Sequence, residues 1–95
     1  MRILFTPAGH RQFLEALAYM YRDNQAPAAN FREKTEKRLT RLKEFPESGR
    51  LVPEFPDLPF REVIIGPYRF FCRFKDQTVW IVAVLHGAQL PYAPA

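Results

Sequence analysis

The sequence FREVIIGPYRFFCRFKDQTVWIVAVLH, residues 60–86, has the pattern of three β-strands joined by two tight turns. Each apolar run is rich in valine, isoleucine, phenylalanine or tryptophan, the residues that favour strands. The runs are interrupted at Gly66-Pro67 and at Asp76-Gln77, where turn-forming residues stand. This stretch therefore predicts an antiparallel meander.

The two faces of this meander follow from the alternation of side chains along a strand. Pairing around the turns places Ile65 opposite Tyr68, Phe74 opposite Val79 and Phe70 opposite Ala83. One face is almost wholly apolar and must be covered: Val63, Ile65, Tyr68, Phe70, Cys72, Phe74, Val79, Ile81, Ala83 and Leu85. The other face is mixed and open to a partner: Glu62, Ile64, Arg69, Phe71, Arg73, Lys75, Thr78, Trp80, Val82, Val84 and His86.

Length and charge set the class of protein. A chain of 95 residues that is 47% hydrophobic is expected to fold as one domain, residues 1–95, with a single small core. The net charge is +4, from 14 Lys and Arg against 10 Asp and Glu. Its long-range field favours acidic partners such as RNA, DNA or an acidic protein.

The single cysteine, Cys72, excludes a disulfide framework and a sequence-local metal site. We expect a soluble cytoplasmic protein, because no apolar run approaches the roughly 20 residues that span a bilayer and the start MRILFTPAGH does not match a secretory signal. Neither a cofactor nor a small-molecule substrate is indicated.

Residues 1–45 predict a strand and a helix hairpin. The apolar run Met1 to Phe5 indicates a first strand, although its neighbour in the sheet cannot be identified. Apolar residues recur at helical spacing from about Ala8 to Asp23. A second amphipathic helix ends at Phe45-Pro46, and its apolar positions are Phe31, Thr35, Leu39 and Leu42. Its basic positions, expected to face solvent, are Arg32, Lys34, Lys37, Arg38, Arg41 and Lys43.

The segment PESGRLVPEFPDLP, residues 46–59, holds four prolines and is expected to be a largely irregular loop. The order of elements is then β-α-α-β-β-β. This is an α+β fold in which a helix hairpin covers one face of a small, mainly antiparallel sheet. Residues 90–95 are expected to be a loose end.

The helix hairpin followed by SGRLVPEF, REVIIGPYRFFCRF and VWIVAVLHGAQLP resembles the RelE/ParE superfamily of bacterial type II toxin-antitoxin and plasmid-stabilisation toxins. The resemblance spans nearly the whole chain. Its most specific parts are Arg61, the pair Tyr68-Arg69 and the strand that ends at His86.

The resemblance implies a growth-inhibiting toxin that a cognate antitoxin protein neutralises. RelE-like members are mRNA interferases that cut mRNA in the ribosome, whereas ParE-like members poison DNA gyrase and do not cut RNA. The leading hypothesis is a metal-independent, ribosome-dependent endoribonuclease. The alternatives are a gyrase poison and a non-toxic module that binds the antitoxin in transcriptional autoregulation.

Cleavage of RNA without a metal needs a base, a cation at the phosphate and an acid. Three residues are the candidate catalytic groups. Arg69 resembles the arginine that RelE-like nucleases use at the scissile phosphate, although it is equally consistent with a sheet-pairing arginine. His86, which the pairing places on the face of Arg69, is the candidate acid or base, or else an edge histidine. Glu54 resembles the acidic base of some members, or else belongs to a plain surface loop.

Four further residues are candidates for substrate binding: Arg73, Trp80, Tyr92 and Arg61. Trp80 is expected either to stack on a base or an antitoxin side chain, or to pack on Arg73 as a structural pair. Arg61 fits a structural or rim position better than a catalytic one. Gln89 stands where many relatives carry an arginine, which removes a phosphate-binding charge and favours the gyrase alternative.

Overall fold

The computed structural model describes residues 1–23 and 25–87 of the chain. Strand β1 (Arg2–Phe5) is followed by the helices α1 (Pro7–Asp23) and α2 (Gln25–Glu44). After them come the 3-10 turn η1 (Pro46–Ser48) and the short strand β2 (Arg50–Leu51). The chain then forms the strands β3 (Arg61–Ile65), β4 (Tyr68–Lys75) and β5 (Thr78–His86).

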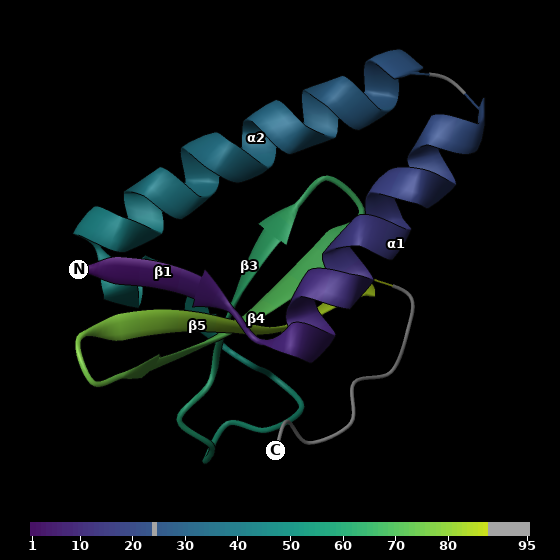
Figure 1. Ribbon diagram of the computed structural model, residues 1–95. Helices are drawn as coiled ribbons and strands as arrows, with labels where there is room; N and C mark the ends of the chain where they lie inside the picture. Colours follow the sequence, from purple (N-terminus) through teal and green to yellow (C-terminus); the bar gives the residue numbers. More distant parts are fainter. Residues whose placement is uncertain (24, 88–95) are drawn as a thin grey trace.

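The strands form one sheet in the order β1-β5-β4-β3-β2. The predicted antiparallel meander is confirmed as β3, β4 and β5. β1 lies at the edge of the sheet, parallel to β5, with Ile3 opposite Val79. Both helices lie on one side of this sheet, so the predicted α+β architecture is confirmed (Figure 1).

The entry into α1 holds that helix against β5. The hydroxyl oxygen of Thr6 accepts a hydrogen bond from the Gly9 N–H at 3.1 Å, and Pro7 occupies the first helical position. A Cβ on Gly9 would lie 2.3 Å from the carbonyl oxygen of Ile81. Only glycine therefore permits this close approach of helix and strand.

The main core lies between the helices and the sheet. Phe70, Leu42 and Ile81 are fully buried there, and Phe31 of α2 packs on Tyr68 with ring centroids 5.3 Å apart. Covering this face removes a large apolar area from water, which is the dominant favourable contribution to folding.

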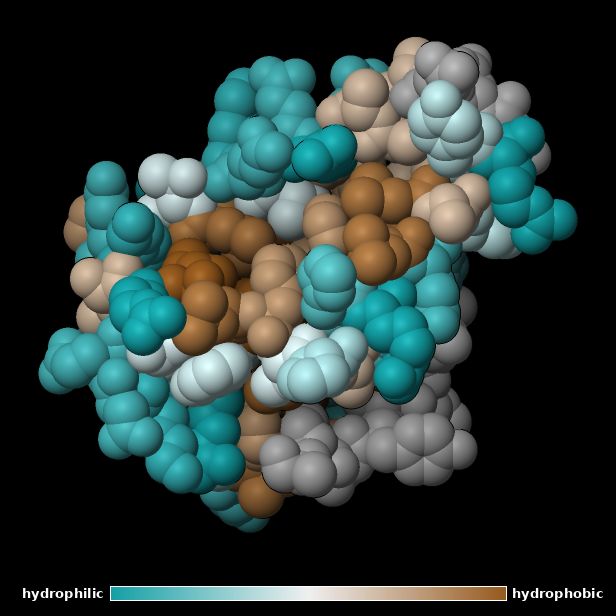
Figure 2. Space-filling view, in the orientation of Figure 1, coloured by the Kyte–Doolittle hydropathy of each residue, from teal (hydrophilic) through white to brown (hydrophobic). Residues whose placement is uncertain are grey.

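The helix side is only partly closed. Figure 2 shows apolar surface between the helices and β1, framed by hydrophilic side chains. The side chains that pack against the core while remaining partly exposed are Ile3, Phe5, Phe13, Leu17, Met20 and Leu39.

One extra residue in β5 changes the predicted faces. Phe71 pairs with Ala83, but the next residue, Cys72, pairs with Ile81, so Val82 is left without a partner in the ladder. Such a bulge shifts the alternation by one residue beyond it. The predicted pairing of Phe70 with Ala83 is therefore wrong, because Phe70 pairs with Val84.

Beyond this bulge the faces of β5 are exchanged. Val84 is buried among the main-core residues, and its N–H donates a hydrogen bond to Oε1 of Gln12 in α1 at 2.8 Å. Ala83 and Leu85, predicted to lie under the helices, pack on the opposite side of the sheet.

A second, smaller core covers the side predicted to be open. The buried side chains Val52, Phe60 and Phe71 form its centre, and Phe55 and Leu58 of the loop between β2 and β3 pack against it. The prediction of an open partner-facing side is therefore wrong for this part of the sheet. Phe71 is 1% exposed because the proline-rich loop folds back over it.

Two other residues, Phe74 and Arg38, lie in environments that differ from the predicted ones. Phe74 was placed on the covered face but is 50% exposed, and it lines a pocket of about 770 Å³ together with Phe45 and Leu51. Arg38 was expected to face solvent, yet its guanidinium donates hydrogen bonds to the hydroxyl and carbonyl oxygens of Ser48. These bonds attach α2 to the turn that follows it.

Candidate functional site

A buried ion-pair cluster lies on the loop-covered side of the sheet and is built around Arg69. The partner that β3 supplies is Glu62, whose carboxylate oxygen Oε2 accepts a hydrogen bond from Arg69 Nε at 2.7 Å. Arg69 Nη2 lies 2.6 Å from the same oxygen. The side chain of Glu62 is fully buried and that of Arg69 is 8% exposed. Charged groups at this depth are stable only when they are paired.

The loop between β2 and β3 supplies a second carboxylate to Arg69. Glu54 accepts hydrogen bonds from Arg69 Nη1 at 2.8 Å and from Nη2 at 2.7 Å. This is the two-pronged geometry that a guanidinium makes with a carboxylate. The hydrogen bonds from Arg69 lower the pKa of Glu54 from 4.5 to about 2.

Arg50 of β2 completes the cluster. Its Nε donates a hydrogen bond to Oε1 of Glu62 at 2.7 Å, so the two oxygens of Glu62 are shared between Arg50 and Arg69. The bonds from Arg69 to Glu54 and then Glu62 raise the pKa of the Arg69 guanidinium despite its burial. The positive charges of two arginines therefore balance the negative charges of two glutamates. The cluster links β2, the loop, β3 and β4.

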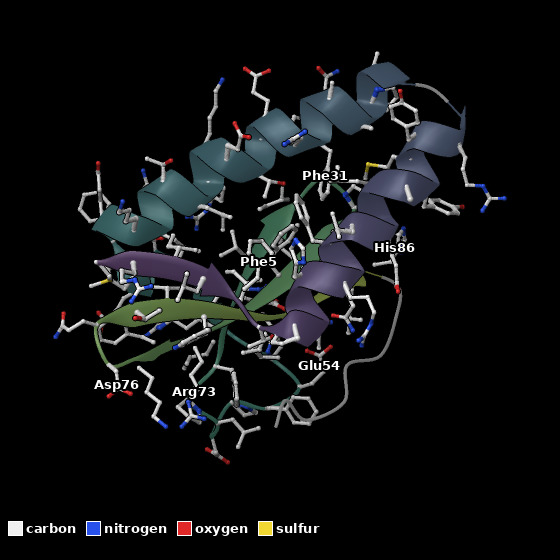
Figure 3. All side chains as sticks on the ribbon, viewed as in Figure 1. Phe5, Phe31, Glu54, Arg73, Asp76 and His86 are labelled. Atoms are coloured by element: carbon white, nitrogen blue, oxygen red, sulfur yellow. The ribbon has the colours of Figure 1, made fainter. Side chains whose placement is uncertain are left out.

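His86 does not join this cluster. Because of the bulge in β5, His86 lies opposite Tyr68, whereas Arg69 lies opposite Leu85. The imidazole of His86 meets the Tyr68 ring edge-on at 5.5 Å between centroids. In Figure 3, His86 lies beside α1, while Glu54 and Arg73 lie below the sheet. The prediction that Arg69 and His86 share one face is therefore wrong.

His86 instead lines a hollow of about 550 Å³ beside α1. The other side chains around this hollow are Gln12, Glu15, Ala16, Tyr19, Tyr68, Val84 and Leu85. Burial and the nearby Tyr19 raise the pKa of the Tyr68 hydroxyl.

Arg73 and Trp80 lie opposite each other on β4 and β5, as the pairing predicted. The guanidinium carbon of Arg73 lies 5.6 Å from the centre of the Phe60 ring, a cation-π arrangement. Trp80 is partly buried and also pairs with Leu4 of β1. The ring on which Arg73 stacks is thus Phe60, and the two alternatives for Trp80, a stacking surface or a structural pair with Arg73, both stay predictions.

Arg61 makes a structural contact, whereas the candidate Tyr92 and the departure from the family pattern at Gln89 cannot be placed. Arg61 Nη1 donates a hydrogen bond to the carbonyl oxygen of Gly49 at 2.9 Å, which joins the start of β3 to the chain before β2. Tyr92 and Gln89 lie outside the described residues. Their roles, and those of the other candidate site residues, stay predictions.

The arrangement around Arg69 is poorly suited to acid-base chemistry. A carboxylate whose pKa is about 2 is a weak base, and Arg69 already donates to two carboxylates. Sequence reasoning placed Glu62 and Arg69 on one face but did not recognise them as a buried pair. Opposite charges on the same face of neighbouring strands were the available signal.

Neither a metal site nor a membrane-spanning helix is present in residues 1–23 and 25–87. Within them, no group of His, Cys, Asp and Glu side chains is arranged to hold a metal ion. Among the same residues, neither helix has the length and apolar character required to cross a membrane.

Comparison with known proteins identifies the family. Residues 3–91 match the family model described as the ParE toxin of the type II toxin-antitoxin system parDE. A solved structure titled "Chromosomal ParDE TA system from P. aeruginosa" has a similar fold, with a TM-score of 0.67 at 15% identity. The similarity covers 90% of this chain and 95% of that one. No curated protein matches the chain. The chain thus belongs to the ParE family of type II toxin-antitoxin toxins.

Proposed function

We propose that this protein arrests growth by poisoning DNA gyrase and that it does not cut mRNA. Family membership implies a toxin with an antitoxin partner. It leaves the target open, and the superfamily resemblance associates ParE-like members with gyrase. We place this action in the cytoplasm.

The arrangement of the candidate catalytic residues carries the proposal. Cleavage of RNA would require a base, a phosphate-binding cation and an acid within reach of one phosphodiester. Arg69 is instead held between Glu54 and Glu62, and His86 lies on the opposite side of the sheet. A nuclease would have to dismantle this ion-pair cluster before its arginine met a phosphate.

The test is a cleavage assay with purified gyrase. Supercoiled plasmid, gyrase, ATP and the purified toxin are incubated, and covalent complexes are then trapped with detergent and digested with protease. We expect linear plasmid to accumulate with the dose of toxin and to disappear when gyrase is omitted. Absence of linear DNA at a dose that arrests growth would exclude this mechanism.

Two further measurements separate the alternatives. New 5′ ends in translated messages after induction, mapped by primer extension, would support the nuclease. Normal growth on expression without an antitoxin, with the protein folded, would support the non-toxic binding module. Both results would contradict our proposal.

A further inference from the structure

Arg69 has two carboxylate partners that differ sharply in their exposure to water. The side chain of Glu62 is fully buried in β3, whereas that of Glu54 is 36% exposed. Glu62 also has a second arginine partner, Arg50. Glu62 is therefore a fixed part of the sheet, while Glu54 contacts both the protein and water.

The position of Glu54 in the chain allows its side chain to move away from Arg69. It belongs to the loop between β2 and β3, outside any helix or strand. Pro53 and Pro56 on either side are exposed. The loop is anchored by the buried side chains Val52 and Phe60, so a movement of Glu54 alone would leave both anchors in place. Water can solvate the released carboxylate because this group is already partly hydrated, so the main cost of release is the loss of its two hydrogen bonds with Arg69.

The position on Arg69 that Glu54 fills, called the carboxylate seat below, has cationic and apolar surroundings. Arg50 is 62% exposed, and Arg73 lies partly exposed on the same side of the sheet as Arg69, stacked on Phe60. Without Glu54, Arg50 and Arg69 would share the single carboxylate of Glu62, and Arg73 would add a further positive charge on the same side of the sheet. The partly buried side chains Phe55 and Leu58 pack beside this surface.

We propose that Glu54 occupies, in the free toxin, a carboxylate seat on Arg69 that an acidic peptide segment of a partner protein takes by exchange. The incoming side chain makes the same two-pronged contact with Arg69, and its neighbours meet Arg50 and Arg73. Arg69 and Arg73 are four residues apart on β4, about 13 Å at the rise of a strand. An extended segment with acidic residues at that spacing and apolar residues between them fits this surface.

Charge and shape favour a peptide over a nucleic acid as occupant. The seat already holds a planar carboxylate, and the 8% exposure of Arg69 admits a slender side chain more readily than a phosphodiester backbone. One external carboxylate would not displace Glu54, because the loop holds Glu54 at high effective concentration. Several acidic residues acting together can displace it, since they gain Arg50 and Arg73 as well.

The experiment measures peptide affinity with and without Glu54. The probe is a short synthetic peptide of alternating glutamate and leucine. Its affinity for every variant is measured by isothermal titration calorimetry, and in the variants that retain Arg69 the contact is located on the Arg69 side-chain N–H signal by NMR. We expect the wild-type protein to bind it and Glu54→Gln to bind roughly tenfold more tightly, because the internal competitor is gone. Glu47→Gln removes the same charge from an exposed position and should retain wild-type affinity.

Two additional variants localise the effect. Arg69→Lys in the Glu54→Gln background keeps a positive charge beside Glu62 but lacks the two-pronged geometry, so the gain in affinity should be lost. Arg73→Gln should weaken binding and reduce its dependence on salt.

Two results would overturn the proposal. One is equal affinity of the Glu54→Gln and Glu47→Gln proteins for the peptide. The other is Arg69-dependent binding of a single-stranded oligonucleotide by Glu54→Gln without binding of the peptide. Neither readout involves gyrase, so failure here is distinguishable from failure of the proposed toxin mechanism.

Discussion

Replacement of Glu62 by alanine tests the buried ion-pair cluster. The Glu62 side chain is fully buried and accepts hydrogen bonds from Arg50 and Arg69, both at 2.7 Å. Its removal leaves the largely buried guanidinium of Arg69 with Glu54 as its remaining carboxylate partner in the cluster. Breaking a buried pair from one side costs about 3–5 kcal/mol. This is a large share of the roughly 5–15 kcal/mol that stabilises a domain.

Urea unfolding at pH 7, followed by circular dichroism and by the fluorescence of Trp80, measures the loss. With a slope of about 1.5 kcal/mol/M for a small domain, the midpoint should fall by about 2–3 M. Glu47→Ala, which truncates an exposed glutamate, is the matched control and should leave the midpoint close to that of the wild type.

The double variant Glu62→Leu with Arg69→Met separates pairing from packing. It removes both buried charges together, and such replacements are often neutral or stabilising. We expect it to recover most of the stability that Glu62→Ala loses. A Glu62→Ala midpoint within about 0.5 M of the wild type, a difference below 1 kcal/mol at that slope, would refute the reasoning.

Three further predictions concern the bulge, the cysteine and the loop carboxylate. Val84→Ala should lower the free energy of unfolding in urea by about 2 kcal/mol, since it removes buried methyl groups. Val82→Ala should lower it distinctly less, and the reverse order would contradict the bulge. Burial raises the pKa of Cys72 to about 12, so iodoacetamide should modify it at pH 8 only after unfolding, and rapid labelling of the folded protein would refute its burial. Glu54 has its pKa lowered to about 2 by Arg69, so the stability from this pair is present above pH 4.5 and lost as the pH falls towards 2. Carboxyl NMR should give a midpoint near 2, and a midpoint near 4.5 would disprove the pairing.

The sequence was sufficient for the architecture because local patterns determine it. The turns at Gly66-Pro67 and Asp76-Gln77 adopt left-handed backbone at Gly66, Asp76 and Gln77, and the strands pair around them as predicted. The helical spacing of apolar residues likewise identified the two helices that cover the sheet.

The candidate site was harder to predict because it depends on two non-local features. One is the bulge at Val82, which carries no glycine or proline signal and moves His86 away from Arg69. The other is the fold-back of the proline-rich loop, which buries Arg69 and brings Glu54 to it. The alternation of side chains along isolated strands predicts neither feature. It therefore placed Glu62 and Arg69 correctly on one face, but it left that face open to solvent.

Induction of the toxin in a single culture tests the central claim most directly, because both kinds of damage can be mapped from the same cells. DNA is recovered with its covalently bound protein to locate gyrase-linked breaks, and RNA from the same sample is mapped for new 5′ ends. We predict gyrase-linked breaks at the onset of growth arrest and an unchanged pattern of mRNA ends. New ends within translated messages, with no increase in gyrase-linked breaks, would contradict the account.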